Sequence, residues 1–397
     1  MTSLQTTASL PIANPNEHVY GLDVFRSFAI LFVLIGHSLE HSKIAEPIKT
    51  LGHMGILGVE LFFVLSGFLI GSILLRLIDK GQLHSWKHIA HFWQRRWLRT
   101  LPMYFVVLIV FLRLDYHGRH GLWDYPTYYV FLQNFATAIP EFFELSWSLA
   151  IEEHFYLWFP LVFLVWQRLC KRASYALVLT AMTFVVVAYT FRLSHPLQSD
   201  WNVFNRLLRM SVLARLDAIM YGVLIAAAKR YAPRLFITIR QLTPLSASAF
   251  VLLCAWWFIN APHLTQTRWM QLHLFTVQAI LCALLLPWFD NWKKTDAKQD
   301  FFTITSKLSY SLYLNHILVI IVINKMLSHL NFFDAAYNNP FIVYPLYFTF
   351  FYSASWVTYH RIEKPFLDLR EQPKNATNFL RAGAVSIAIC LAFILFF

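Results

Sequence analysis

Long apolar runs recur along most of this chain, and they constrain its fold more than any other feature. A helix needs about 20 apolar residues to cross a bilayer, and many of these runs approach that length. Because the hydrocarbon core holds no water, such segments must satisfy their backbone hydrogen bonds internally. We therefore expect an all-α fold, a polytopic membrane helix bundle of about 10–11 transmembrane helices. The expected spans are 22–40, 54–78, 100–114, 146–167, 173–192, 209–228, 243–260, 271–289, 308–328, 341–360 and 378–397.

The charged residues show where the chain meets water. Only 14% of residues are charged, whereas about a quarter are charged in a typical soluble domain. Most basic residues fall in the short links between apolar runs, where membrane proteins keep their cytoplasmic charge. This placement explains the net charge of +12, so we expect no nucleic-acid partner. It also places the N-terminus in the cytoplasm.

The segment 123–138, WDYPTYYVFLQNFATA, is aromatic but only weakly apolar. As a full span it would invert everything downstream and leave most of the later basic links outside. We therefore expect a partial or re-entrant element at this place.

The rest of the chain adds no second domain. The first twenty residues are polar and lack the basic and apolar regions of a signal peptide. We expect residues 1–21 to form a cytoplasmic tail and residues 22–366 to form the membrane domain. Residues 367–397 are expected to hold a linker and an extra C-terminal helix. The four cysteines have no metal-type spacing, so no metal site is expected.

Two ionisable residues stand in the first expected span, DVFRSFAILFVLIGHS. Arg26 and His37 are eleven positions apart, which is three helical turns plus about 20°, so they share one helix face. Along the axis they are about 16 Å apart. With the N-terminus inside, Arg26 lies near the cytoplasmic surface and His37 in the outer half of the bilayer. Ionisable groups at such depth mark functional paths, although a lone histidine can also serve only to hydrogen-bond a neighbouring helix.

Other ionisable residues lie in or near the following spans. Glu60 lies inside the apolar run GVELFFVLSGFLIG. Arg96 and Arg99 are three residues apart and therefore share a helix face at the mouth of the third span. Glu152 and Glu153 come shortly after the start of the span that contains LSWSLAIEEHFYLWFP. Together with the first span, these residues outline a polar path through the bundle.

The ordered set of motifs resembles the acyltransferase 3 family, the membrane acyltransferases that O-acetylate bacterial surface polysaccharides. The matching features are the arginine–ten–histidine spacing, GVELFFVLSGF, the RxxR pair before LP, WSLAIEEHFYL followed by proline, ARLDAIMYG, SYSLYLNH and IEKPF. They cover residues 20–366 in the family's order. One departure is His154, where family members more often have glutamine.

The resemblance implies that acetyl-CoA binds from the cytoplasm and that the acetyl group reaches a sugar hydroxyl at the outer side. Arginine pairs with phosphate oxygens through a planar fork and stays charged. Arg95, Arg96 and Arg99 are therefore candidates for holding the coenzyme A phosphates, with Arg26 at the entrance to the path. Ordinary positive-inside topology is the alternative reason for each of these arginines.

Transfer from a thioester to a hydroxyl requires that the hydroxyl lose its proton as it attacks. His37 is the candidate general base, since neutral histidine suits that role. A carboxylate can orient the ring, with Glu153 as the first choice and Glu152 as the second. Consecutive helix positions differ by 100°, so we do not expect both to face one site. The sequence does not decide whether His37 is only a base or briefly carries the acetyl group.

Three further residues, Glu60, Arg215 and Asp217, are candidates for binding the substrate. For Glu60, a structural hydrogen bond within the bundle is an equal alternative. Arg215 and Asp217, two residues apart, do not face each other on a helix. Asn315 and His316 in SYSLYLNH are expected early in the ninth span, near the cytoplasmic side. There they would line the coenzyme path or only bridge helices.

The expected setting is a bacterial inner membrane, with membrane lipid around the bundle and a glycan as the acceptor. The acceptor classes are an O-antigen, an exopolysaccharide or a lipid-linked sugar, and the sequence is compatible with a homo-oligomer. The main alternative is a secondary transporter with an intramembrane Arg/His/Glu path. We find no inverted repeat and no paired Gly/Pro-broken helices to favour it. A purely structural scaffold would leave the ionisable residues on one face of the first span unexplained.

Overall fold

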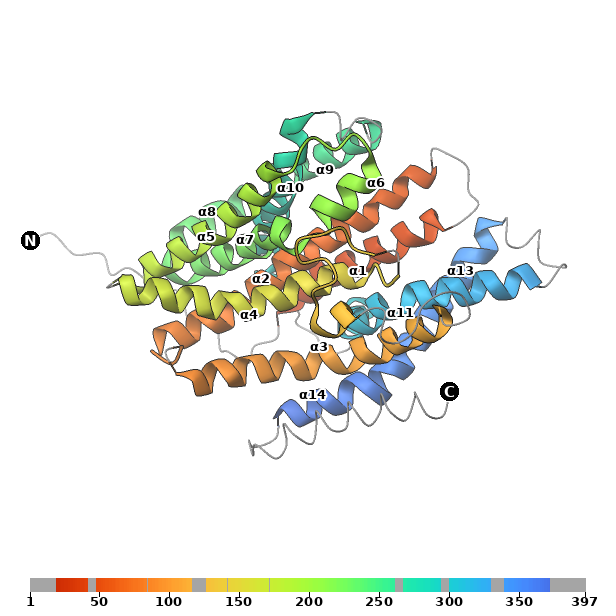
Figure 1. The fold of residues 1–397 in the computed structure, drawn as a ribbon, viewed down its shortest axis with the longest axis horizontal. Coiled ribbons are helices and arrows are strands. Elements are labelled where there is room, and N and C mark those ends of the chain that lie inside the picture. The colour runs from red at the N-terminus through yellow and green to blue at the C-terminus, as the bar shows by residue number, and fades with distance from the viewer. Residues whose placement is uncertain are drawn as a thin grey trace, which may run out of the picture.

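The structure is a computed structural model that describes residues 19–41, 48–83, 85–115, 126–140, 142–170, 172–260, 267–293, 300–329 and 339–371. Over these residues the chain is built from helices and contains no strand (Figure 1). The long helices are α1 (Tyr20–Glu40), α2 (Met54–Asp79), α3 (Trp86–Asp115), α4 (Ser146–Leu169), α5 (Ala173–Ser194), α7 (Val212–Tyr231), α9 (Thr243–Asn260), α10 (Arg268–Phe289), α11 (Phe301–His329) and α13 (Pro340–Thr358). Shorter elements are η1 (Ile48–His53), η2 (Pro126–Val130), α6 (Trp201–Phe204), η3 (Asn205–Arg209), α8 (Pro233–Gln241), η6 (Tyr359–Glu363) and α14 (Lys364–Glu371).

The helices confirm the expected all-α polytopic bundle. Within the described residues, seven helices are long and apolar enough to cross a membrane, or up to nine if each of two bent pairs forms one span. Every expected span from 22–40 to 341–360 contains a helix. α13 is long enough to cross but is not among the seven, because its tyrosines and prolines make it less apolar. The expected span 378–397 lies outside the described residues.

Two helices begin well before the apolar runs that predicted them. α3 starts at Trp86 rather than near residue 100, and α11 starts at Phe301 rather than near residue 308. Their first turns carry polar and basic residues, which a search for apolar runs passes over, although no residue there breaks a helix. His316 therefore lies about 22 Å along the axis from the start of α11. The expectation that Asn315 and His316 lie early in their helix was wrong.

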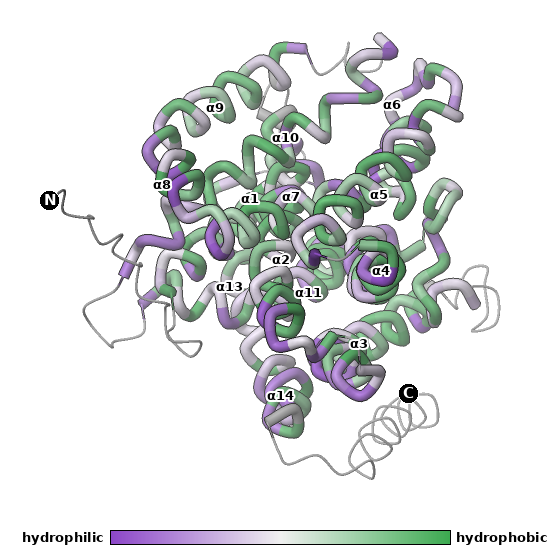
Figure 2. Tube along the Cα trace, turned by 90° about the vertical axis from the view of Figure 1, so that its left-hand side faces the viewer, coloured by the Kyte–Doolittle hydropathy of each residue, from purple (hydrophilic) through white to green (hydrophobic). Residues whose placement is uncertain are grey.

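α2 occupies the centre of the bundle. Viewed along the helices in Figure 2, α7 and α10 lie above α2 and α3 lies below it, and α1 packs against both α2 and α11. Small residues allow α2 and α7 to approach closely. A Cβ atom at Gly67 would lie 1.9 Å from the Ile219 carbonyl oxygen, and one at Gly222 would lie 2.0 Å from the Val64 carbonyl oxygen. The two backbones are therefore in direct contact.

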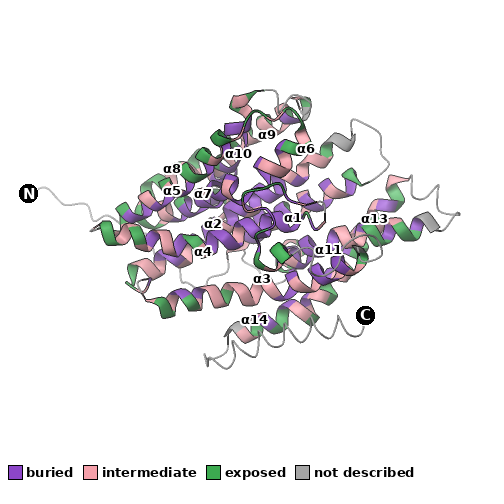
Figure 3. Cartoon of the chain, in the orientation of Figure 1, coloured by how far each residue is buried: buried purple, intermediate pink, exposed green. Residues whose placement is uncertain are grey.

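Burial follows the arrangement expected for a bundle surrounded by lipid. Buried residues concentrate along the middle of the bundle in Figure 3. Large apolar side chains remain exposed on the outer helices, for example Val186 on α5, Leu252 on α9 and Phe341 on α13. In water such a surface would be a liability, but against lipid tails it is favourable.

The described part of 123–138 is not a membrane-spanning helix. Residues 126–130 form the short 3-10 helix η2, and the described residues 131–140 and 142–145 that follow are not helical. The Asn134 side chain is fully buried and donates to the backbone carbonyls of Trp147 and Met210. His154 is joined to the Phe131 carbonyl, at 3.0 Å from its Nε2. Inside a membrane, irregular backbone is tolerated only where other protein groups form hydrogen bonds with its polar atoms.

Candidate active site

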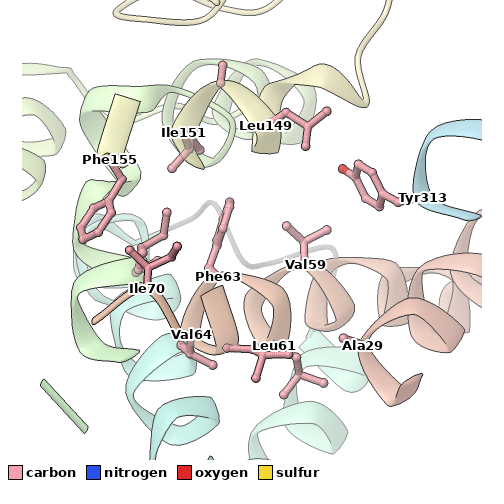
Figure 4. Close-up of a cluster of buried hydrophobic side chains, with 14 of the residues drawn as sticks. Ala29, Val59, Leu61, Phe63, Val64, Ile70, Leu149, Ile151, Phe155 and Tyr313 are labelled. Carbon is pink, nitrogen blue, oxygen red and sulfur yellow. The ribbon is translucent and has the colours of Figure 1, made fainter. Parts of the chain in front are cut away.

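A cavity lies among α1, α2, α3, α4 and α11. It has about 800 Å³ of empty volume, including its open mouth, which is within the range of small-molecule sites. Figure 4 shows part of its apolar wall, where Val59 and Phe63 of α2 point toward α4 and Tyr313 of α11 points into the space between them. The polar residues that line the cavity are Arg26, Ser66, Arg96, Arg99, Thr100, Ser148, Glu152, Tyr156, Ser309, Tyr310 and Tyr313.

Contacts between α1 and α11 define two levels of the site. At the first level, Arg26 Nη1 donates to Ser306 Oγ at 3.3 Å, and the Ser306 hydroxyl donates to Asp23 at 2.7 Å. At the second level, His37 Nδ1 lies 3.0 Å from His316 Nε2. The two helices therefore run side by side in the same direction. Arg26 and His37 face the same neighbour, as their spacing predicted.

Positive charge gathers at the first level. Arg26, Arg96 and Arg99 line the cavity, whereas Arg95 is exposed and is not among the described lining residues. The Arg96 guanidinium lies over the Tyr156 ring, 5.7 Å from its centroid. Arg26 and Arg99 are close enough to repel each other, while Asp23, Glu152 and Glu363 lie close enough to Arg26 to offset part of this repulsion. Within the described part of the chain, neither Arg26 nor Arg99 has a carboxylate at ion-pair distance. An anionic ligand would relieve this repulsion.

The two consecutive glutamates point to different places. Glu152 lines the cavity and accepts a hydrogen bond of 2.7 Å from the Tyr156 hydroxyl. Glu153 is buried against α3 and accepts a hydrogen bond of 2.8 Å from Thr100. Among the described contacts, neither carboxylate reaches His37. The 100° step along α4 separates the two side chains, as expected, but it turns Glu153 toward α3 rather than toward the histidine. A catalytic role for either glutamate stays a prediction.

A histidine pair forms the second level. The rings of His37 and His316 have centroids 5.0 Å apart. Tyr313, one turn before His316, lines the cavity, and its ring lies 5.9 Å from the His316 ring. The Tyr313 hydroxyl is held by the Ser148 hydroxyl at 2.7 Å and by the Leu145 carbonyl at 3.0 Å. The cavity wall formed by Tyr313 therefore borders the histidine pair.

The three residues expected to bind substrate are engaged in buried ion pairs. Arg215 Nη2 lies 2.6 Å from Glu60 Oε2, and both side chains are at most 1% exposed. Asp217 accepts two hydrogen bonds of 2.7 Å from Arg192 Nη2. None of the three expected residues is among the described residues that line the cavity. These contacts match the structural alternative stated for Glu60, and a substrate-binding role stays a prediction for all three.

Arg209 is a residue that the sequence did not single out. It ends the π-helical turn η3, where the chain bends by 62° into α7. Its guanidinium lies 4.5 Å from the Trp147 ring centroid and donates to Asn205, while Nη1 has no hydrogen-bond partner among the described residues. The side chain is only 5% exposed and lies close enough to His37 to interact with it electrostatically. A buried cation thus stands near the histidine pair.

A helical pattern in SYSLYLNH could have identified the second level. Ser309, Tyr313 and His316 follow the i, i+4, i+7 spacing of one helix face, and all three face the site. No comparable pattern marks Arg209, because it lies in an irregular turn. In the described part of the chain, no group of three or more His, Cys, Asp or Glu residues could hold a metal ion.

The fold and site define a membrane-embedded bundle with a cationic cavity beside a histidine pair. Comparison with known proteins places this bundle in a family. The family model described as "Acyltransferase domain", that of acyltransferase 3, matches residues 19–360. The chain therefore belongs to the acyltransferase 3 family, which favours an acyltransferase over the transporter alternative.

Individual relatives match a shorter part of the chain. The peptidoglycan O-acetyltransferase OatA of Listeria monocytogenes is 32% identical over 171 residues, which is 38% of this chain and 26% of the relative. The O-acetyltransferase OatA of Staphylococcus aureus is 30% identical over 161 residues, 37% of this chain and 25% of the relative. The matched segments thus span about a quarter of these relatives. No solved structure matches the chain significantly.

Proposed function

We propose that this protein transfers an acetyl group from acetyl-CoA to a hydroxyl of a cell-surface glycan across a bacterial inner membrane. The observation that carries the proposal is the cavity itself. Arg26, Arg96 and Arg99 line it at one level, and Tyr313 borders the histidine pair at the other. Family membership supplies the reaction class, and the O-acetyltransferase names of the relatives support acetyl transfer to oxygen.

The arginines suit the phosphate groups of coenzyme A. Guanidinium groups form short, charge-assisted hydrogen bonds with phosphate oxygens. Arg26, Arg96 and Arg99 all face the cavity, so they would hold the phosphates while the thin pantetheine arm follows the apolar wall toward Tyr313. The exposed Arg95 would attract the coenzyme rather than contact it inside the cavity.

His37 would remove the proton from the glycan hydroxyl as the oxygen attacks the thioester carbon. The distance of about 16 Å along α1 between Arg26 and His37 is the depth that the acyl arm must cover. In this proposal the N-terminus is cytoplasmic, so the donor enters at the arginine level and the acceptor approaches the histidine level from outside. The glycan is an O-antigen, an exopolysaccharide or a lipid-linked sugar.

The test uses purified protein in nanodiscs, with acetyl-CoA binding measured by calorimetry. Transfer of radiolabelled acetyl is measured to a mixed preparation of surface polysaccharides. Arg99→Ala should weaken acetyl-CoA binding about 10- to 100-fold, because hydrogen bonds to charged groups contribute about 1.5–3 kcal/mol. His37→Ala should bind acetyl-CoA normally but lose transfer about 10²- to 10⁴-fold.

Arg168→Ala is the matched control, because Arg168 is an exposed arginine at the end of α4, outside the cavity. It removes one positive charge and should leave both binding and transfer at the wild-type level. If the wild-type protein does not bind acetyl-CoA, the donor assignment fails. If His37→Ala transfers at the wild-type rate, the role of His37 as base fails while the donor assignment stands.

A further inference from the structure

We propose that His316 is a positioning residue that fixes the tautomer of His37, so that His37 Nε2 is the atom that takes up the acceptor proton. The proposal rests on the proposed acetyl transfer with His37 as base. It assigns to a histidine of α11 the orienting role that the sequence had suggested for a carboxylate of α4.

The donor and acceptor roles in this hydrogen-bond chain can be assigned by starting from a backbone carbonyl. His316 Nδ1 lies 3.1 Å from the carbonyl oxygen of Leu312, one turn earlier in α11. A carbonyl oxygen can only accept, so His316 Nδ1 must carry a hydrogen and donate it. His316 is fully buried, and a charged imidazole without a carboxylate partner is costly there. The neutral ring has a hydrogen on Nδ1 and therefore a lone pair on Nε2.

That lone pair decides the state of His37. His316 Nε2 is 3.0 Å from His37 Nδ1, and since Nε2 can only accept, His37 Nδ1 must be the donor. The neutral His37 ring then has its lone pair on Nε2. The chain of donors runs from His37 through His316 to the Leu312 carbonyl, and it leaves a single proton acceptor, His37 Nε2, at its end. In serine hydrolases a carboxylate fixes the histidine tautomer in the same sense.

With this tautomer, His37 can accept the acceptor's proton and pass it to the leaving sulfur. The glycan oxygen bonds to the acetyl carbonyl carbon while its proton moves to His37 Nε2, giving an imidazolium and a tetrahedral intermediate. The intermediate collapses, the carbon–sulfur bond breaks, and the leaving sulfur takes the proton from Nε2. The products are the acetyl ester and free coenzyme A, and His37 returns to its starting tautomer. Throughout the cycle His37 Nδ1 keeps its hydrogen bond to His316.

Other charged or titratable groups also face His37, and they bear on any pH profile. They are Glu40 and His41 at the end of α1 and Arg209 in η3, together with His316 on α11. His41 is bonded through its Nδ1 to the backbone carbonyl of His37 rather than to the ring. Of these groups, His316 is the one hydrogen-bonded to the His37 ring among the described contacts, and the backbone of Val33 on α1 also interacts with this ring.

The test compares two amides at position 316 that differ by one methylene group. The glutamine amide oxygen of His316→Gln reaches about as far from the backbone as Nε2 and can accept from His37. The amide of His316→Asn reaches only as far as Nδ1 and removes the acceptor that His316 offers to His37 Nδ1. We expect His316→Asn to lower kcat about 10²-fold or more, with unchanged KM and unchanged acetyl-CoA binding, because a wrong tautomer impairs the base. His316→Gln should retain kcat within about tenfold, with the pH profile of the wild type.

Equal kcat values for the glutamine and asparagine variants would overturn the proposal, whether both are active or both are inactive. Acetyl-CoA binding and thermal unfolding, measured on each variant, separate a catalytic loss from a folding defect. If His316→Asn does not fold, the comparison of wild type with His316→Gln still decides, because a loss above tenfold in a folded glutamine variant contradicts an acceptor role. His37→Ala is assayed in parallel. An active His37→Ala protein would refute His37 as the base, the part of the proposed function on which this role of His316 depends, while the acetyl-CoA assignment would stand.

Discussion

The buried ion pair between Glu60 and Arg215 is expected to stabilise the fold, and substitutions at these two residues can test this role. Both side chains are inaccessible to solvent, so removing one partner strands a charge in the bundle. We expect Glu60→Leu to destabilise the folded protein by about 3–5 kcal/mol. The double variant Glu60→Leu with Arg215→Met should recover most of this loss, because an apolar pair of similar volume needs no desolvation. Thermal unfolding in nanodiscs measures both effects.

Asp79 provides the control for that experiment. It pairs with Arg230 on the surface, where about a third of each side chain is exposed. Asp79→Asn should therefore change stability by less than about 1 kcal/mol. A Glu60→Leu protein as stable as the Asp79→Asn protein would mean that the pair does not hold the bundle together. Glu60 would then be free for a role in binding.

Substitution of Arg209 is expected to lower the transfer activity without lowering the stability of the fold. A buried guanidinium without an ion-pair partner among the described residues costs desolvation energy, which methionine of similar length would relieve. We expect Arg209→Met to unfold at the same or a higher temperature than wild type. Transfer should fall about 10²-fold, because a nearby cation stabilises the negative charge that develops on the thioester oxygen. An Arg209→Met protein with full transfer activity would show that this cation does not act on the reaction.

At the residue scale, helical spacing predicted some neighbours and missed others. The eleven-residue interval placed Arg26 and His37 on one face, and both meet α11. The partner of His37 could not be read from the same pattern, since it depends on which helix packs against α1. Glu153 follows the family motif but faces Thr100. His316 was misplaced because the polar first turns of α11 were not counted as helix.

At the scale of helices, the contact between α2 and α7 yields a prediction. A Cβ atom at Gly67 would fall 1.9 Å from a backbone oxygen, so Gly67→Ala must push the two helices apart. We expect a destabilisation of about 1–3 kcal/mol, measured by thermal unfolding. Gly55→Ala is the matched control, since its Cβ would meet its nearest neighbour at 3.8 Å, an ordinary contact. Equal unfolding temperatures for the two alanine variants would refute this close packing.

The apolar runs predicted where helices lie better than where they end. Ten of the expected spans coincide with helices, because a lipid-facing segment must close its own hydrogen bonds. The early starts of α3 and α11 were missed because polar residues at a membrane surface are as compatible with helix as with loop. The non-helical chain after η2 was anticipated only from the distribution of basic residues among the links between spans. The buried hydrogen bonds that Asn134 of this chain donates to the carbonyls of Trp147 and Met210 were beyond any local pattern.

The order of helices in space is a property of the whole molecule that no single segment encodes. α1 and α11 lie far apart in sequence, yet their contacts create both levels of the site. The cavity also needs α2, α3 and α4, so its residues come from five separate segments. Sequence motifs identified most of these residues through the family resemblance. Their assignment to the cavity, the ion pairs or the histidine pair required the packed bundle.

The proposed direction of transfer makes the orientation of the whole bundle testable. Residue 80, between α2 and α3, should face the cytoplasm, whereas residue 199, between α5 and α6, should face outward. Both side chains are exposed, so a cysteine at either site can react with a maleimide. In a cysteine-free background and right-side-out vesicles, a membrane-impermeant maleimide should label Ser199→Cys and spare Lys80→Cys. Detergent should expose both sites equally, which controls for intrinsic reactivity. The reverse labelling pattern would place the arginine level outside the membrane, where cytoplasmic acetyl-CoA could not reach it, and the donor would have to be sought among extracytoplasmic anions.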